Sequence, residues 1–243
     1  MHYLYRIYNN FKLYGILLTI NRIIFFIYIY SSSFIRKKIN LDKIILKKKQ
    51  SLNYYFNFFD CDKGYEVYPP YHFSWTKKKF SNLGPVYEKY LKKFRNKKIS
   101  ILEIGVYRGK SMASFLSYFQ KALYFGIDIM PNLNEFKSQR ARIFKSNSTI
   151  FNVKNLNNVK FNFIIDDGSH IKKEVIQNFN KFSSLIKKGG YYIVEDVNEN
   201  IFEYFKKFYK ANCNVNKFSF KLYKNRRQSN SVLIIQKNVK IFK

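Results

Sequence analysis

Strand-like and helix-like segments alternate through the second half of the chain. The strand-like segments are short and apolar, and they lie at residues 99–104, 124–129, 141–144, 161–165 and 191–194. Ahead of the last one, apolar residues recur at helical spacing and predict a helix that ends at Gly189 and Gly190: Ile171, Val175, Phe179, Phe182 and Ile186. Strands that alternate with helices form a parallel sheet covered on both faces. The pattern therefore predicts a doubly wound α/β fold, and segments 218–223 and 231–236 predict a final antiparallel strand pair.

A glycine-containing turn follows the first predicted strand. Residues 103–109 read Glu-Ile-Gly-Val-Tyr-Arg-Gly, and glycine is needed where backbone passes close to a ligand. Asp128 ends the second strand about 20 to 25 residues later, where a carboxylate can accept both hydroxyls of a ribose. Two interpretations of Glu103 stay open, since it either braces the turn through backbone hydrogen bonds or supports a cofactor indirectly. The G-x-G-x-x-G spacing of dinucleotide enzymes is absent, which disfavours a dinucleotide.

Acidic residues gather at the ends of the fourth and fifth predicted strands. The fourth ends in Asp166 and Asp167, with His170 shortly after, and the fifth ends in Glu195 and Asp196. Ligands bind outside the carboxyl ends of parallel strands, where these side chains would meet. Four carboxylates repel one another unless a cation lies among them, and hard oxygen ligands suit magnesium, calcium or manganese. For Asp166 and Glu195 the alternative is a structural role, in which they cap helices or bind backbone amides.

Two sets of motifs resemble known families. The E-x-G-x-x-x-G turn resembles the first motif of class I S-adenosylmethionine-dependent methyltransferases. The sequence I-D-D-G-S-H, then a helix, then G-G-x-Y-x-x-E-D, resembles the metal-dependent sugar O-methyltransferases of macrolide tailoring and their relatives in bacterial polysaccharide clusters. Upstream, the D-K-G sequence at 62–64 and His72 resemble a segment that folds over the active site in that family. The resemblance covers roughly residues 60–197.

The resemblance implies a Rossmann-like fold, a cofactor, a metal and an acceptor. S-adenosylmethionine would be the cofactor, Mg²⁺ or another divalent cation the metal, and a sugar hydroxyl of a glycan or glycosylated metabolite the acceptor. His170 would act as the general base beside Asp167. The metal ligands would be Asp167, Glu195 and Asp196. The cofactor would be bound by Glu103, Gly105, Gly109, Asp128 and Asp166. Residues of the substrate site or lid would be Lys63 and His72. The nearest alternative is a catechol-like or other small hydroxyl acceptor.

The N-terminal part predicts an extension of the catalytic domain. Residues 13–35 are apolar and aromatic, but Asn21 and Arg22 interrupt them, and the uninterrupted run 23–30 is too short to span a bilayer. We expect helices that pack on the catalytic domain, with peripheral membrane contact as the alternative. The chain then divides into a helical or amphipathic extension at 1–58, a loop and helix covering the active site at 59–96, and the Rossmann-like domain at 97–243. We expect that residues 1 to about 50 can be removed without loss of cofactor binding.

Composition narrows the remaining classes of protein. The formal net charge is +30, which leaves a nucleic-acid-binding or RNA-modifying protein as an alternative, but the lysines are scattered and no recognition motif accompanies them. We therefore expect no specific nucleic-acid partner. The two cysteines, Cys61 and Cys213, match no metal or redox spacing and favour a reducing cytoplasm, at the inner face of the membrane if the N-terminal segment binds lipid. An oligomer and a membrane-attached scaffold without activity both stay open.

Overall fold

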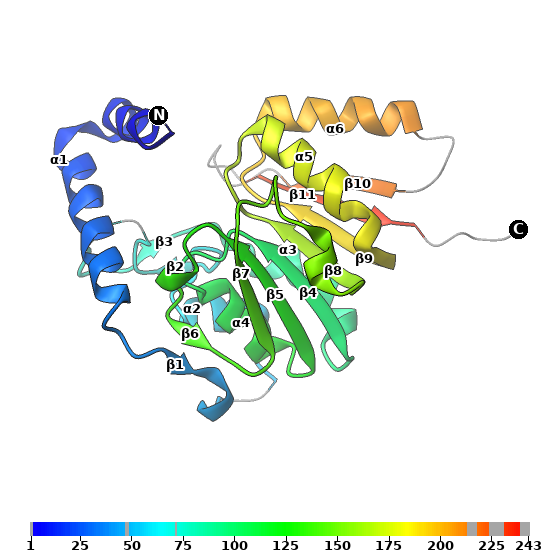
Figure 1. The fold of residues 1–243 in the computed structure, drawn as a ribbon, viewed down its shortest axis with the longest axis horizontal. Helices are drawn as coiled ribbons and strands as arrows, with labels where there is room; N and C mark the ends of the chain where they lie inside the picture. Colours follow the sequence, from blue (N-terminus) through cyan, green and yellow to red (C-terminus); the bar gives the residue numbers. More distant parts are fainter. Residues whose placement is uncertain (1, 47–48, 71, 213–217, 224–230, 239–243) are drawn as a thin grey trace, which may run out of the picture.

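A seven-stranded sheet forms the centre of the protein in a computed structural model (Figure 1). The structure describes residues 2–46, 49–70, 72–212, 218–223 and 231–238. The strand order is β10-β11-β9-β8-β4-β5-β7. The five strands β9, β8, β4, β5 and β7 run parallel to one another. The strands are β4 (Ile99–Ile104), β5 (Ala122–Asp128), β7 (Ala141–Lys145), β8 (Phe161–Asp166), β9 (Ile186–Val194), β10 (Phe218–Tyr223) and β11 (Val232–Lys237).

Helices cover both faces of the sheet and bury two hydrophobic clusters. One cluster lies under α2 (Leu52–Phe58), α3 (Gly84–Leu91) and α4 (Lys110–Tyr118), and the other lies under α5 (Lys172–Phe182) and α6 (Glu199–Asn212). Successive residues of a strand point to opposite faces. Ile101 and Phe163 therefore join the α4 side, whereas Leu102 and Ile164 join the α5 side. Short 3-10 turns complete the connections: η1 (Leu41–Lys43), η2 (Lys92–Phe94), η3 (Pro131–Leu133), η4 (Val153–Leu156) and η5 (Ser183–Leu185).

The predicted fold class is confirmed. The sheet is mostly parallel and doubly wound, and β10 and β11 form the predicted antiparallel pair at its edge. The chain runs from β4 outward to β5 and β7, then returns to β8 on the other side of β4. This reversal of direction creates a switch point between the carboxyl ends of β4 and β8, where open α/β sheets bind their ligands.

The predicted helix end at Gly189 and Gly190 is wrong. Helix α5 ends at Phe182, and both glycines lie within β9. The pairing of β8 with β9 is irregular there, Gly189 has φ 71°, and a Cβ on Gly190 would lie 2.6 Å from the carbonyl oxygen of Asn162. The glycines therefore allow a bulged strand to approach its neighbour closely, which is a second reason for glycine at such a position.

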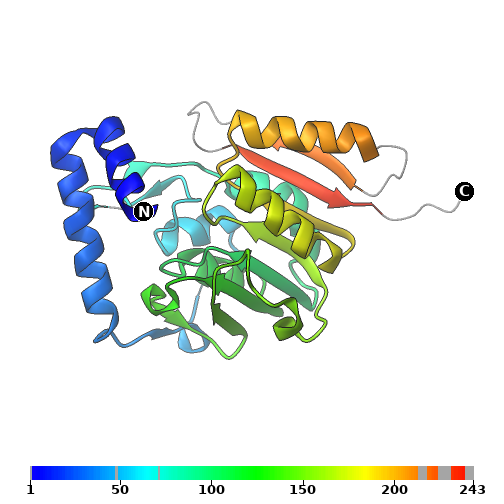
Figure 2. The same ribbon diagram turned by 45° about the horizontal axis from the view of Figure 1, so that its top comes forward.

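A long N-terminal helix, α1 (His2–Ser33), stands on the opposite side of the molecule from the C-terminal strand pair (Figures 1 and 2). It is kinked at Gly15, and one face packs through Phe25 and Ile29 against Leu133. The segment Gly15–Ser33 has a mean hydropathy of 1.5 and is long and apolar enough to cross a membrane, by length and composition. This corrects the expectation that the stretch is too short, because a single arginine does not divide it into separate apolar runs.

The residues that follow α1 pack into the same domain as the seven-stranded sheet. Strand β1 (Ile39–Asn40) pairs in parallel with β6 (Phe136–Lys137), and a further small pair joins β2 (Glu66–Val67) to β3 (Lys78–Lys79). Leu41 and the α2 residues Leu52 and Phe56 are buried in the cluster under α4. The predicted boundary near residue 58 therefore lies within one hydrophobic core, and the expectation that residues up to about 50 can be removed stays a prediction.

Candidate active site

The turn after β4 is pressed against the turn after β8. Gly105 has φ 84°, and a Cβ there would overlap the carbonyl oxygen of Asp167. Backbone hydrogen bonds join Gly105 N to Ile127 O and Asp167 N to Ile104 O, both at 2.9 Å. Gly109, with φ 75°, caps the start of α4, and a Cβ there would overlap the side chain of Asn134. Both glycines are therefore required by sterics, and Gly105 allows the turn after β4 to lie against the turn after β8.

Asp128 holds the glycine turn through backbone amides. Its Oδ2 accepts hydrogen bonds from Val106 N and Tyr107 N, both at 2.7 Å, and its Oδ1 accepts one from Met130 N at 2.6 Å. The residue is 9% exposed. A carboxylate offers about four lone-pair positions, so one is left for a ligand. The turn itself therefore uses most of the carboxylate, and the predicted contact of Asp128 with a ribose stays a prediction.

Glu103 and Asp166 lie beneath the carboxyl edge, on opposite faces of the sheet. Glu103 is buried and accepts hydrogen bonds from Ser111 Oγ at 2.8 Å and from the Tyr124 hydroxyl, and burial raises its pKa to about 7. Its partners are side chains, not the backbone of the turn. Asp166 is buried against Asn178 and accepts a hydrogen bond from the Tyr192 hydroxyl at 3.0 Å, and burial raises its pKa to about 6. The hydrogen bonds of both carboxyl groups therefore go to protein groups, as expected of a structural role, and their contact with a cofactor stays a prediction.

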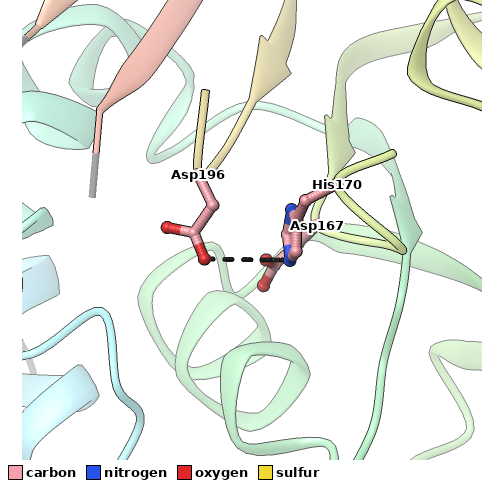
Figure 3. A group of neighbouring side chains, drawn as sticks. All are labelled: Asp167, His170 and Asp196. Carbon is pink, nitrogen blue, oxygen red and sulfur yellow. Dashed lines mark ion pairs between the residues drawn. The ribbon is translucent and has the colours of Figure 1, made fainter. Parts of the chain in front are cut away.

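Asp167, His170 and Asp196 form the cluster at the edge (Figure 3). One ligand atom from each lies within 4.8 Å of the others. His170 Nε2 is 3.8 Å from Asp167 Oδ1 and 3.7 Å from Asp196 Oδ2. His170 and Asp196 have φ 55° and 50°, in the left-handed region that histidine, aspartate and asparagine enter more often than most other residues with a side chain. Because two carboxylates and an imidazole meet at the carboxyl edge of a parallel sheet, the cluster is the strongest candidate for chemistry.

A buried lysine separates Glu195 from that cluster. Lys63 is 2% exposed, and its ammonium contacts Asp167 Oδ2 and lies 3.1 Å from Glu195 Oε1, which also accepts a hydrogen bond from the Tyr87 hydroxyl. The predicted metal ligands thus differ in one member from the group that the structure assembles. Asp167 and Asp196 lie together, His170 joins them, and Glu195 is turned inward because Lys63 and Tyr87 hold it.

Burial and neighbouring charges shift the pKa values of the charged groups in the site. Burial lowers the pKa of Lys63, but the carboxylates of Asp167 and Glu195 outweigh it and raise that pKa well above its usual value. Burial, together with repulsion from Asp167, raises the pKa of Glu195 well above its usual range. The pKa of Asp196 is raised to about 6 by burial and by Asp167, although His170 opposes the change. Added positive charge at the edge would relieve this repulsion.

Lys63 and His72, the two residues predicted upstream of the first sheet strand, differ in their distance from the acidic cluster. Lys63, predicted for the substrate site or lid, reaches the centre of the acidic group from the loop before β2. His72 Nδ1 contacts the carbonyl oxygen of Phe73 at 3.0 Å, and no contact recorded for the described residues joins its ring to the acids. Tyr87 was missed because it lies on an apolar helix face, where its spacing matches that of a core residue.

An open cavity of about 360 Å³ lies at the carboxyl ends of β5 and β7, beside Asp128. It is lined by Phe26, Tyr30, Ile129, Met130, Asn132 and Lys145. Its volume falls in the range of small-molecule sites. The glycine turn, the acidic cluster and this cavity all lie at the carboxyl edge of the sheet.

Comparison with known proteins agrees with this geometry. Residues 102–197 match the family model described as a methyltransferase domain. The match spans the sheet from β4 to the end of β9 and includes both the glycine turn and the acidic cluster.

Among curated proteins, the chain is 27% identical over 122 residues to mycinamicin VI 2''-O-methyltransferase of Micromonospora griseorubida, covering 46% of this chain and 31% of the relative. It is 28% identical over 120 residues to 8-demethyl-8-alpha-L-rhamnosyl tetracenomycin-C 2'-O-methyltransferase of Streptomyces olivaceus, covering 46% and 32%. The chain therefore spans about a third of the length of these relatives.

The solved structure of MycE methyltransferase from the mycinamycin biosynthetic pathway, in complex with Mg, SAH and mycinamycin VI, matches with a TM-score of 0.60 and 20% identity, over 79% of this chain and 54% of that one. This likeness supports the fold.

Proposed function

We propose that the protein is an S-adenosylmethionine-dependent O-methyltransferase that methylates a sugar hydroxyl of a glycan or glycosylated metabolite with the help of a divalent cation. The cluster of Asp167, His170 and Asp196 at the switch point carries the proposal. The relatives named above methylate sugars of glycosylated small molecules, which supports the choice of acceptor. A catechol-like acceptor would need the same metal chemistry and is the alternative that an acceptor panel separates.

The residues present fit a divalent cation. Asp167 and Asp196 offer hard carboxylate oxygens within reach of a single ion, as magnesium or manganese requires. Burial and, to a lesser extent, the Asp167 carboxylate raise the pKa of Asp196, and a cation beside both carboxylates would favour their charged forms. Glu195 is the third predicted ligand, and it would have to turn away from Lys63 to take part. We propose Asp167 and Asp196 as the carboxylate ligands of the cation. Glu195 would be a third ligand only if Lys63 moved away from it.

The residues of this chain would then divide the chemical work. Bound S-adenosylmethionine supplies the methyl group, and a divalent cation supplies positive charge that makes a neighbouring sugar hydroxyl more acidic. His170 Nε2 takes the hydroxyl proton as general base. The carboxylates of Asp167 and Asp196, at 3.8 and 3.7 Å, stabilise the imidazolium that results. Lys63 fixes Asp167 from the buried side, so the carboxylate keeps its position while the proton moves.

Label transfer tests this function. The purified chain is incubated with S-adenosylmethionine labelled in the methyl group and with glycosylated macrolides, glycans and catechols, with and without Mg²⁺ or a chelator. We expect label on sugar acceptors only, and only with the cation. Label on catechols alone would show that the acceptor is a catechol-like hydroxyl and not a sugar hydroxyl. No binding of S-adenosylhomocysteine and no transfer to any acceptor would overturn the methyltransferase assignment itself.

We also propose that α1 attaches the enzyme to the cytoplasmic face of an anionic membrane. Its outer face exposes Leu17, Ile20, Ile24 and Ile27, at 85%, 47%, 54% and 60% of their surface. A basic run, 36–38, follows the helix, and the whole chain carries a net charge of +30. An exposed apolar stripe beside basic residues suits a helix that lies in a lipid headgroup layer. Since its other face packs on Leu133, the helix would lie along the surface.

Vesicle flotation checks the membrane proposal. The protein should float with vesicles that contain phosphatidylglycerol and much less with phosphatidylcholine alone. Ile24→Glu should abolish flotation, whereas Leu123→Glu, at a site of similar exposure on β5, should not. Equal flotation of both variants would overturn the proposal.

A further inference from the structure

The cavity beside Asp128 draws part of its wall from outside the methyltransferase domain. Ile129 and Met130 follow directly after β5, and Lys145 ends β7, so these belong to the carboxyl edge of the sheet. Phe26 and Tyr30 come from α1, more than seventy residues before the matched domain begins at residue 102. The helix thus closes a cavity that the sheet leaves open on one side.

The chemistry of the cavity suits a purine ring. Two aromatic rings, Phe26 and Tyr30, lie nearly parallel, with centroids 6.2 Å apart and an interplanar angle of 17°. Ile129 and Tyr30 expose 53% and 42% of their surface, so a ligand can reach them. Flat aromatic ligands bind between aromatic and aliphatic side chains because their faces are apolar and polarisable. The lysine and asparagine at the rim, Lys145 and Asn132, provide donors for ring nitrogens.

The cavity also adjoins Asp128, the residue predicted to contact the ribose of the cofactor. Met130 N donates to Asp128 Oδ1 at 2.6 Å, and Ser146 N donates to the carbonyl oxygen of Asp128 at 2.9 Å. The cavity therefore begins one residue beyond the carboxylate predicted to meet the ribose. A base attached to that ribose would extend toward β7 and α1.

Several contacts hold α1 in this position. Phe25 and Ile29 are 7% and 3% exposed and pack on Leu133. Asn132 Nδ2 donates to Ser33 Oγ at 3.1 Å, and an ion pair of 3.0 Å joins Arg36 to Glu135. The helix is thus docked by apolar and polar contacts on the turn that follows β5.

We infer that α1 is a part of the cofactor site, with Phe26 and Tyr30 contacting the purine ring of S-adenosylmethionine together with Ile129 and Met130. The inference rests on the proposed function, since it names residues that would bind the same cofactor. It assigns to a segment outside the matched domain a role in binding, beside the membrane contact proposed for its opposite face. Tyr30 and Phe26 are positioning residues for the cofactor and lie away from the methyl group.

Calorimetry with S-adenosylhomocysteine tests the inference on the full chain. We expect Tyr30→Ala and Phe26→Ala each to weaken binding on the order of tenfold, as loss of one stacking partner does. The matched control is Ile27→Ala, on the outer face of the same helix, which should change the affinity less than about twofold within the usual scatter for exposed sites. Adenosine should lose affinity by the same factor as S-adenosylhomocysteine, because only the purine end is involved.

The outcomes separate the inference from the function on which it rests. Unchanged affinity of Tyr30→Ala and Phe26→Ala, with normal binding to the wild type, would overturn the inference and leave the methyltransferase assignment standing. Absence of binding to the wild type would overturn both. Hydrogen exchange on the wild type tests the contact between α1 and the cofactor without a substitution. Bound S-adenosylhomocysteine should slow exchange in peptides covering 24–33 as well as 104–109, and slowing at 104–109 alone would contradict the inference.

Discussion

Lys63 is the residue on which the charge balance of the site depends. Its buried ammonium lies between Asp167 and Glu195, so without it two carboxylates would share a volume from which water is largely excluded. Breaking a buried ion pair by removing one partner typically costs about 3 to 5 kcal/mol. We expect Lys63→Met to lower the free energy of unfolding by about this amount, measured by urea titration.

Magnesium should recover part of that loss, since a cation at the edge can replace the missing charge. The control is Lys77→Met, because Lys77 lies 3.7 Å from Asp60 in a partly exposed ion pair. An exposed pair contributes at most about 1 kcal/mol. If Lys63→Met is as stable as Lys77→Met, the lysine does not balance the buried carboxylates.

Glu103 should give stability a distinct pH dependence. Burial raises its pKa from 4.5 to about 7, so between these values the folded protein keeps a proton that the unfolded chain releases. Stability contributed by this group is fully present below pH 4.5 and is lost as the pH rises through 7, by about 3 kcal/mol at most. Glu103→Gln cannot lose the proton. The stability of the variant relative to wild type should therefore rise with pH between 5 and 7, and parallel curves would contradict the raised pKa.

At the scale of elements, the site depends on two turns that touch. Gly105 after β4 is in the left-handed region and faces the carbonyl oxygen of Asp167 after β8, so a side chain there must separate the turns. We expect Gly105→Ala to cost about 2 kcal/mol or more, from backbone strain plus the displaced contact. Gly168→Ala is the control, because Gly168 lies outside the left-handed region and a Cβ there would meet the end of the Ile104 side chain at 3.3 Å, not a backbone carbonyl. Thermal unfolding measures the difference, and Gly105→Ala should have the lower melting temperature of the two variants. Equal melting temperatures would show that the turns are not in tight contact.

Sequence patterns predicted the elements of the sheet and the places where its strands end. The strand ends at Asp128, Asp166 and Val194 follow from apolar runs that stop at acidic residues, which is a local signal. The bulge at Gly189 could not be separated from a helix end, because glycine satisfies both backbone conformations. The contact of Lys63 with Glu195 was also out of reach, since it joins residues far apart in the chain through side-chain packing alone.

At the scale of the whole molecule, the N-terminal third is part of the domain. Deleting residues 1–35 removes α1 but leaves β1 and Leu41 in place, whereas deleting residues 1–50 also removes the β1 pairing and a buried leucine. Burial of such a side chain contributes about 1.5 to 3 kcal/mol. We expect the shorter deletion to unfold cooperatively and to bind S-adenosylhomocysteine weakly, and the longer deletion to melt at a clearly lower temperature. Equal melting temperatures would show that residues 36–50 do not stabilise the core.

The account as a whole depends on a metal-assisted transfer at the edge of the sheet. Magnesium titration of cofactor-loaded protein by calorimetry, with turnover on an active acceptor, tests it most directly in wild type, Asp167→Asn and His170→Ala. Asparagine keeps the shape of aspartate but loses its charge, so Asp167→Asn should weaken both magnesium binding and turnover. His170→Ala should leave magnesium binding nearly intact and lower turnover on the order of a hundredfold, the usual scale of general-base catalysis. Wild-type turnover that survives chelation unchanged would contradict the account.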